Sequence, residues 1–131
     1  MSNATVVPAT TDPRGRAAEV PVDVPDGQVV LLNSFVVPPE RDDDFLALWT
    51  LTSHYFRRQP GFVSLRLHRA VSPDAHFRYV NVATWESAVD FQRPYELEEF
   101  RALVSDPHWG HYASSPALYE VIVAKVAGDA E

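Results

Sequence analysis

The sequence predicts an α+β domain with the element order β-α-β-β-α-β. Three observations carry this prediction: four apolar segments rich in β-branched residues, one segment with apolar residues at three- and four-residue spacing, and turn residues at the boundaries. With 131 residues, 46% of them hydrophobic, the chain has room for one core. We expect residues 28–127 to form this domain, between flexible tails at 1–27 and 128–131.

Residues 1–27 differ from the rest of the chain. They carry four of its prolines (Pro8, Pro13, Pro21 and Pro25), whereas the seven Phe, five Tyr and three Trp all follow Ser34. A segment without aromatic residues buries too little surface to offset the entropy lost on ordering. We therefore expect a mobile tail, with an arm that reaches onto a partner subunit as the alternative.

The first strand is predicted over Val29–Val37, which is nearly continuously apolar, as in strands covered on both faces. Pro39 suits the first turn of a helix, and apolar spacing predicts an amphipathic helix over about 40–58. Asp42–Asp44 then fall in its first turn, where the helix dipole favours acidic residues. A metal site at this acidic triplet is the alternative interpretation.

A hairpin follows the first helix. Pro60 and Gly61 form the turn into a second strand over Phe62–Val71. The polar segment 72–76 then connects this strand to a third one over Phe77–Glu86.

A second helix is predicted to begin at Ser87, the first residue of a capping-box pattern. Pro94 should break it, so that Tyr95–Val104 continues as a separate turn. A loop over 105–116 leads to the last strand, predicted over Ala117–Val126. This order of elements is that of the ferredoxin-like plait.

Both faces of the predicted strands are apolar. On the first strand, Leu31, Asn33 and Phe35 share one face, while the other carries small or β-branched residues suited to sheet-on-sheet contact. An uncovered sheet of this kind would expose a large apolar patch. We therefore expect a homodimer that forms a composite α+β barrel, with a monomer covered by its own N-terminal tail as the alternative.

Carboxamides interrupt the aromatic residues on one face. Asn81 and Trp85 lie four residues apart on one strand and share a side, and Asn33 on a neighbouring strand can point the same way. Leaving a buried amide unpaired costs about 1–3 kcal/mol. These groups therefore either satisfy one another or bind the oxygens of a ligand, and together they favour an apolar pocket for a carbonyl or phenol.

Other candidate groups are less specific. His54 falls on or beside the apolar stripe of the first helix, where it faces either the pocket or the helix flank. Trp109, with His108 and His111 on either side, belongs to a loop that either closes over a pocket mouth or is a plain surface loop. The histidine spacing is a poor metal signal.

Composition excludes several function classes. Without cysteine there are no disulfides, zinc ribbons or thiol nucleophiles. The net charge of -7 disfavours nucleic acid and anionic membranes as partners. No apolar run approaches the roughly 20 residues of a membrane helix, and no signal-peptide pattern begins the chain. We expect a cytoplasmic protein that binds a small organic molecule and holds no metal.

Four segments resemble the antibiotic biosynthesis monooxygenase domain, namely 29–41, 60–69, 78–87 and 116–121. The likeness covers about residues 29–126, and its most specific piece is the Trp-Glu-Ser that begins at Trp85. The resemblance implies a dimeric α+β barrel. In the best-understood members, it implies a cofactor-independent oxygenase that converts anthrone-type polyketides to quinones.

The resemblance also implies residue roles. In such enzymes an Asn four residues before the strand-ending Trp helps to bind substrate oxygens, and Asn33 matches another Asn that relatives place in the pocket. We therefore expect Asn33, Asn81 and Trp85 to be the catalytic residues. The residues expected to bind substrate are His54, Tyr79, Arg69, Phe35, Tyr95 and Trp109.

No cofactor is expected. One branch of the same superfamily degrades haem and uses a histidine ligand four residues after a phenylalanine. The corresponding residues here are Phe100 and Val104, and valine offers iron no ligand atom.

An anthrone anion is electron-rich enough to reduce dioxygen without metal or flavin, so the expected partners are an aromatic substrate and dioxygen. His54 or the substrate's own phenolate would accept the proton. Two other classes stay open. A non-redox polyketide cyclase or isomerase would consume no oxygen, and a non-catalytic ligand-binding accessory protein would form no product.

Overall fold

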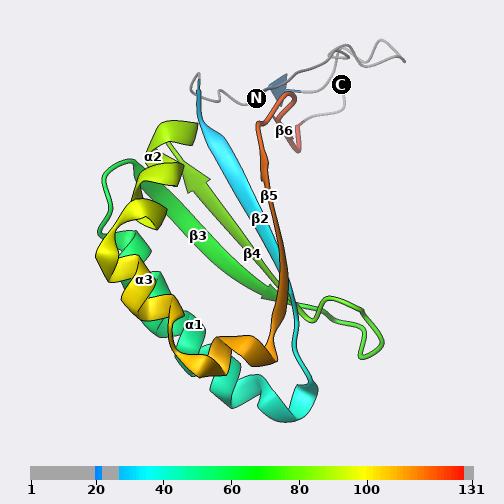
Figure 1. Ribbon diagram of the computed structural model, residues 1–131. Helices are drawn as coiled ribbons and strands as arrows, with labels where there is room; N and C mark the ends of the chain where they lie inside the picture. The colour runs from blue at the N-terminus through cyan, green and yellow to red at the C-terminus, as the bar shows by residue number, and fades with distance from the viewer. Residues whose placement is uncertain (1–19, 22–26, 129–131) are drawn as a thin grey trace.

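The computed structural model describes Val20–Pro21 and residues 27–128 of the chain. In that part, a four-stranded antiparallel sheet in the order β3-β4-β2-β5 carries helices on one face (Figure 1). The strands are β1 (Val20–Pro21), β2 (Val29–Val36), β3 (Phe62–Arg69), β4 (Tyr79–Trp85), β5 (Ala113–Tyr119) and β6 (Lys125–Val126). The helices are η1 (Pro39–Arg41), α1 (Asp42–Arg57), α2 (Ala88–Gln92), η2 (Arg93–Glu96), α3 (Glu98–Val104) and η3 (Pro107–His111).

The main elements follow the predicted β-α-β-β-α-β order. β2 and β4 are the central strands of the sheet, and β3 and β5 are its edges. A helical unit crosses over between β2 and β3, and another between β4 and β5. This arrangement is the ferredoxin-like fold, which confirms the predicted fold class.

The predicted start and break of the second helix are confirmed. The Ser87 hydroxyl caps α2 by accepting a hydrogen bond from the Asp90 backbone N–H at 3.1 Å. Pro94 has no N–H and follows the last residue of α2 closely, so the chain passes through the short η2 turn before α3 begins. The predicted second helix is therefore divided into α2, η2 and α3.

The last strand differs from its prediction. β5 begins at Ala113 rather than Ala117 and ends at Tyr119, and only the short β6 occupies the end of the predicted strand. Pro116 was expected to precede the strand, but it lies within it opposite Asn33. Because β5 is an edge strand, one side of its backbone needs no ladder partner, and a proline is tolerated there.

Little of the predicted N-terminal tail is described. Val20–Pro21 forms a two-residue antiparallel pair with Lys125–Val126. The remainder of the predicted tail up to residue 26, and residues 129–131 of the predicted C-terminal tail, lie outside the described residues.

Two separate cores hold the helices on the sheet. The first is built around Phe45 of α1, which is fully buried and stacks on Tyr79 with ring centroids 4.8 Å apart. The second is built around Trp85, which packs edge-on against Phe62 at 5.3 Å. The first core also contains Phe35, Val37, Leu48 and Tyr112, and the second contains Leu31 and Ala83.

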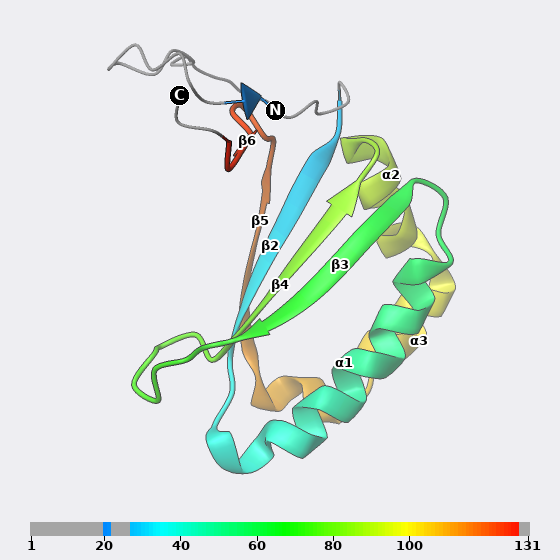
Figure 2. The ribbon, with the colours of Figure 1, turned by 180° about the vertical axis from the view of Figure 1, so that it is seen from behind.

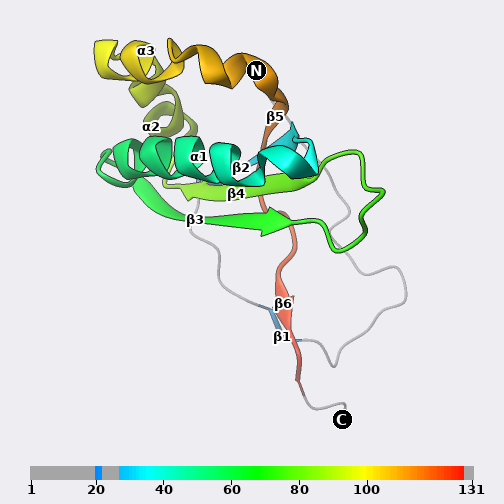
Figure 3. The same cartoon turned by 90° about the horizontal axis from the view of Figure 1, so that it is seen from below.

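None of the described helices covers the opposite face of the sheet (Figure 2 and Figure 3). On that face, Leu32 and Val82 are cross-strand partners and are only partly buried. β5 is exposed along its whole length, and apolar Ile122 and Val123 after it are 55% and 50% exposed. We call the face that carries Leu32 and Val82 the outer face.

Candidate functional site

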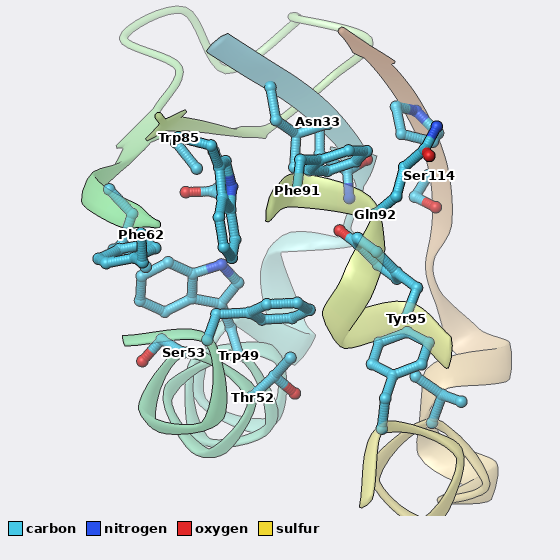
Figure 4. A pocket seen from close by; sticks show the side chains of 18 of the residues that line it. Asn33, Trp49, Thr52, Ser53, Phe62, Trp85, Phe91, Gln92, Tyr95 and Ser114 are labelled. Carbon is cyan, nitrogen blue, oxygen red and sulfur yellow. The ribbon is translucent and has the colours of Figure 1, made fainter. Parts of the chain in front are cut away.

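A cavity of about 590 Å³ lies between the sheet and the helices, on the face opposite the outer face. Figure 4 shows Trp85 and Phe62 on one side of it, α1 side chains beneath, and Tyr95 with Gln92 facing Ser114 of β5 on the other side. The volume is within the range of pockets that bind small organic ligands. The sheet contributes Leu31, Asn33, Phe35, Phe62, Leu65, Asn81, Ala83, Trp85, Ser114 and Pro116 to the lining.

The two carboxamides meet at the centre of the sheet wall. Asn33 of β2 and Asn81 of β4 are direct antiparallel partners, so their Cβ atoms are about 5 Å apart. The Oδ1 atoms of both are buried without a hydrogen-bond partner. An unsatisfied buried amide group costs about 1–3 kcal/mol. The pair is therefore costly for the fold, and a ligand that hydrogen-bonds to it would recover this free energy.

Two indole groups lack partners as well. Trp85 is 1% exposed, and both its Nε1 and that of Trp109 are buried without an acceptor. Trp85 belongs to one core and Trp109 packs against the other. Both tryptophans line the cavity, each beside a different core, and the carboxamide pair lies on the strands between those cores.

Tyr95 of η2 forms part of the helical wall. Its ring is held by Phe56, Phe91 and Phe100, whose centroids lie 5.3, 5.0 and 4.8 Å away. Burial, and to a smaller extent the neighbouring Tyr55 hydroxyl, raise the pKa of Tyr95 to about 12. At neutral pH Tyr95 is therefore a fixed, uncharged hydroxyl at the cavity wall.

Charge is scarce around the cavity. Among the described residues that line it, Glu96 is the one carboxylate, and no Lys, Arg or His side chain is present. Glu96 and its neighbour Gln92 are exposed, as are Ser114 and Pro116 of β5. These exposed lining residues place the cavity mouth between η2 and β5.

Six of the nine predicted site residues line the cavity. Asn33, Asn81 and Trp85 do so as a group, and Phe35, Tyr95 and Trp109 complete the set. The other three, His54, Tyr79 and Arg69, are not lining residues.

The positions of these three have simple causes. His54 is exposed on α1, because the residue before it, Ser53, already faces inward and one helical step turns the next side chain by about 100°. Tyr79 points to the correct face of the sheet, but Phe45 stacks over it. Arg69 is exposed at the end of β3, beyond the cavity.

The sequence analysis did not predict which residues of α1 line the cavity. Trp49, Thr52, Ser53 and Phe56 all line the cavity, at the three- and four-residue spacing of one helix face. Ser53 uses its hydroxyl within the helix, donating to the Thr50 carbonyl at 2.7 Å. The apolar stripe of α1 was visible in the sequence, but nothing there told which stripe residues face a cavity and which fill a core.

The family of this chain follows from comparison with known proteins. The family model described as antibiotic biosynthesis monooxygenase matches residues 28–106, which is more than half of the chain. The chain belongs to this family. The match includes three of the four segments on which the resemblance was based, namely 29–41, 60–69 and 78–87, and with them both carboxamides and Trp85.

Solved structures agree with the assignment to the antibiotic biosynthesis monooxygenase family. A candidate monooxygenase from Shewanella loihica is 28% identical, with a TM-score of 0.63 over 72% of this chain and 94% of that one. SnoaB, a cofactor-independent oxygenase from Streptomyces nogalater, is 27% identical, with a TM-score of 0.62 over 72% of this chain and 93% of that one.

A more distant structure supports the fold. A DABB-family protein with a ferredoxin-like fold from Mesorhizobium loti is 12% identical, with a TM-score of 0.59 over 73% of this chain and 98% of that one. No curated protein matches the chain.

The described residues contain neither a cluster suited to a metal ion nor a helix suited to span a membrane. No group of three or more His, Asp or Glu side chains in the described part of the chain is arranged to hold a metal ion. Val104, the position at which haem-degrading relatives are expected to carry their ligand, lies at the cavity wall. None of the helices between residues 27 and 128 is both long enough and apolar enough to cross a membrane.

Proposed function

We propose that this member of the antibiotic biosynthesis monooxygenase family oxidises an anthrone- or hydroquinone-type aromatic polyketide to a quinone, without a cofactor. The observation that carries the proposal is the group of unpaired amide and indole groups on Asn33, Asn81 and Trp85 at the wall of an otherwise apolar cavity. SnoaB, with which the chain shares 27% identity, is a cofactor-independent oxygenase.

The cavity suits the stabilisation of a substrate anion. N–H donors directed at a developing phenolate act as an oxyanion hole does, and they count for more in a site that excludes water. The Trp85 indole supplies one such donor, and its Nε1 is buried without a partner. The unpaired atoms of Asn33 and Asn81 are their amide oxygens, which would accept from a substrate hydroxyl, and in this proposal the NH₂ group of each amide donates to the anion. The aromatic side chains that surround them would pack on the faces of a fused-ring substrate.

The reaction needs no external reductant. Loss of one proton from the ring CH₂ gives the anthrone anion, which passes one electron to dioxygen. The resulting carbon radical and superoxide combine and take up a proton to form a carbon-bound hydroperoxide. Loss of the second C–H proton with cleavage of the O–O bond leaves a carbonyl carbon and releases water. One oxygen atom of dioxygen enters the quinone, the other leaves as water, and the substrate supplies both electrons for that reduction.

The substrate's own phenolate is the proton acceptor in this proposal. His54, the candidate base on the chain, is exposed on α1 and does not line the cavity. Glu96 lines it but lies at the solvent-exposed mouth. The described lining residues therefore offer no buried base, whereas a hydroxylated anthrone carries an ionisable phenol next to its reacting ring.

We also propose that the functional unit is a homodimer joined through the outer face. The partly exposed Leu32 and Val82 on this face, and the apolar residues after β5, would form an unfavourable surface in water. A second copy of the same sheet is complementary to it in size and polarity.

The decisive test is oxygen uptake by purified, colourless, metal-free protein incubated with a panel of anthrones and hydroxylated anthrones. We expect one dioxygen consumed for each quinone formed, and loss of turnover under anaerobic conditions. A product that forms at the same rate without oxygen would indicate a cyclase or isomerase instead. Tight binding of the panel without any product would indicate a binding protein.

A further inference from the structure

The two unpaired indoles stand at opposite ends of the cavity. Trp85 lies opposite Val29 at the start of β2, and Trp109 packs on Phe35 near the end of that strand, with ring centroids 6.4 Å apart. From Val29 to Phe35 the strand rises by about 20 Å. A single oxygen atom bound by Trp85 is therefore out of reach of Trp109.

Trp109 is held firmly in this position. The Asp106 carboxylate caps η3 by accepting a hydrogen bond from the His108 backbone N–H at 2.9 Å. The Trp109 backbone N–H donates to the Asp106 carbonyl at 3.1 Å. After the turn, the Tyr112 N–H returns to the Trp109 carbonyl at 3.1 Å. The indole also packs edge-on against Phe45, with centroids 6.5 Å apart. The position of the indole ring is thus fixed, and its Nε1–H has no hydrogen-bond partner.

An indole differs from a carboxamide in what it can bind. Asn33 and Asn81 offer both a donor and an acceptor, so they adapt to many ligand groups. The indole N–H is a donor only. A ligand that satisfies both Trp85 and Trp109 must therefore carry acceptor atoms at two separated positions.

We propose that Trp109 is a specificity-determining residue, which binds a second oxygen at the far end of a fused-ring ligand that lies along the strands. The cavity then selects aromatic compounds oxygenated on a terminal ring, in addition to the oxygen bound near Asn81. This inference rests on the proposed function for the aromatic nature of the ligand, and it adds which substitution pattern is accepted.

Binding of stable quinones tests the inference without turnover. Calorimetric titrations would compare 2-hydroxyanthraquinone with 2-methylanthraquinone, a pair matched in size, in slightly acidic buffer that keeps the phenol neutral. We expect the wild-type protein to bind the hydroxyl compound about 10-fold more tightly, the effect of one hydrogen bond to a donor otherwise left unpaired. Trp109→Phe keeps an aromatic ring but removes the N–H, and should abolish this preference. Trp49→Phe, at another indole of the same cavity, should retain it.

A second ligand pair needs no variant. The wild-type protein should prefer 2-methoxyanthraquinone to the similarly sized 2-ethylanthraquinone, because a methoxy oxygen accepts a hydrogen bond but cannot donate one. Equal affinities within both pairs for the wild-type protein would overturn the inference, as would a preference that survives Trp109→Phe. An equal loss for all four ligands on Trp109→Phe would show that the ring only fills space.

Oxygen uptake with 1-hydroxyanthrone, which carries its own phenol as the proton acceptor, is measured on the same preparations and tests the proposed function separately. If the protein shows the ligand preference but consumes no oxygen, the inference about Trp109 holds and the oxygenase proposal fails. If it consumes oxygen but shows no ligand preference, the oxygenase proposal holds and the inference about Trp109 fails.

Discussion

Asn33 and Asn81 face each other across β2 and β4 at the level of the sheet that lies between the two cores. On β2, Asn33 is preceded on the same face by Leu31 of one core and followed by Phe35 of the other. Asn81 stands in the same way between Tyr79 and Ala83. A pair of carboxamides thus occupies the place where a continuous core would have two apolar side chains.

Asn81→Leu should lower the rate of quinone formation and raise the stability of the fold. Leucine has a similar size and no polar atom to leave unpaired, so the free energy of unfolding should rise by about 1 kcal/mol. Quinone formation should fall by about 10²–10³, the effect of losing one donor at a developing oxyanion. Urea denaturation and oxygen uptake measure the two effects. Thr84→Val, on the outer face of the same strand, is the control and should retain turnover. An Asn81→Leu protein that is both less stable and fully active would contradict the assigned role.

Asp42→Asn should reduce stability at neutral pH and have less effect in acid. Two hydrogen bonds from Arg78, at 2.8 and 2.7 Å, hold the pKa of the Asp42 carboxyl below its usual value. A lowered folded-state pKa adds stability above the unfolded-state value of about 3.9, and this contribution is lost as the pH falls through the folded-state pKa.

The wild-type and Asp42→Asn unfolding curves should therefore separate at neutral pH and converge below about pH 4. Thermal unfolding of both proteins across this pH range measures the difference in stability between them. Asp43→Asn, at the exposed next position of the same helical turn, is the control. A constant difference at every pH would show that the carboxylate charge is not responsible.

Gly61→Ala should destabilise the domain, and Gly110→Ala should not. Gly61 has a φ of +83°, which disfavours a side chain by about 1–2 kcal/mol. A Cβ at this position would also collide with the Asp90 side chain, which hydrogen-bonds to Ser87 at the start of α2. A Cβ at Gly110 would meet no atom. Denaturant midpoints of the two variants, compared with wild type, test the difference, and equal midpoints would contradict it.

His54→Gln and Glu96→Gln should each leave kcat/KM within about twofold of wild type, because neither side chain is assigned as the base. The pH at which activity rises should instead follow the phenol pKa across a series of substituted anthrones. Steady-state rates over a pH range for three or four substrates are sufficient. A rise at one fixed pH for every substrate, abolished by either substitution, would place the base on the protein.

Val82→Arg should shift the protein toward monomers, since it places a charge at the centre of the proposed sheet-on-sheet contact. Val71→Arg, at a fully exposed position in the hairpin loop, is the control. Sedimentation velocity measures the mass of each. A wild-type protein that sediments as a monomer would reject the proposed dimer directly.

The fold was accessible from the sequence because its signals are local. The apolar run of β2, the spacing of α1, the cap at Ser87 and the break at Pro94 each depend on neighbouring residues. The start of β5 was wrong because Pro116 marks a boundary in most strands, and its tolerance depends on β5 being an edge strand. Edge position is a property of the assembled sheet, which no local pattern reports.

The site was accessible only in part, for a similar reason. Strand alternation placed Asn33, Asn81 and Trp85 on one face, and the register then brought the carboxamides together. Tyr79 shares that face, but whether a helix residue such as Phe45 covers it depends on how α1 lies on the sheet. His54 was uncertain because one step along a helix decides between cavity and solvent.

The separation of the two cores has a consequence for how this family can diversify. Phe45 of α1 belongs to one cluster and Phe56 of the same helix packs against the other, so the two ends of α1 contact different sheet residues. Side chains around the space between the two clusters can therefore be exchanged while the scaffold keeps its shape. Evolution or design could in this way adapt the cavity to new ligands while the packing at both ends of the helical layer stays the same.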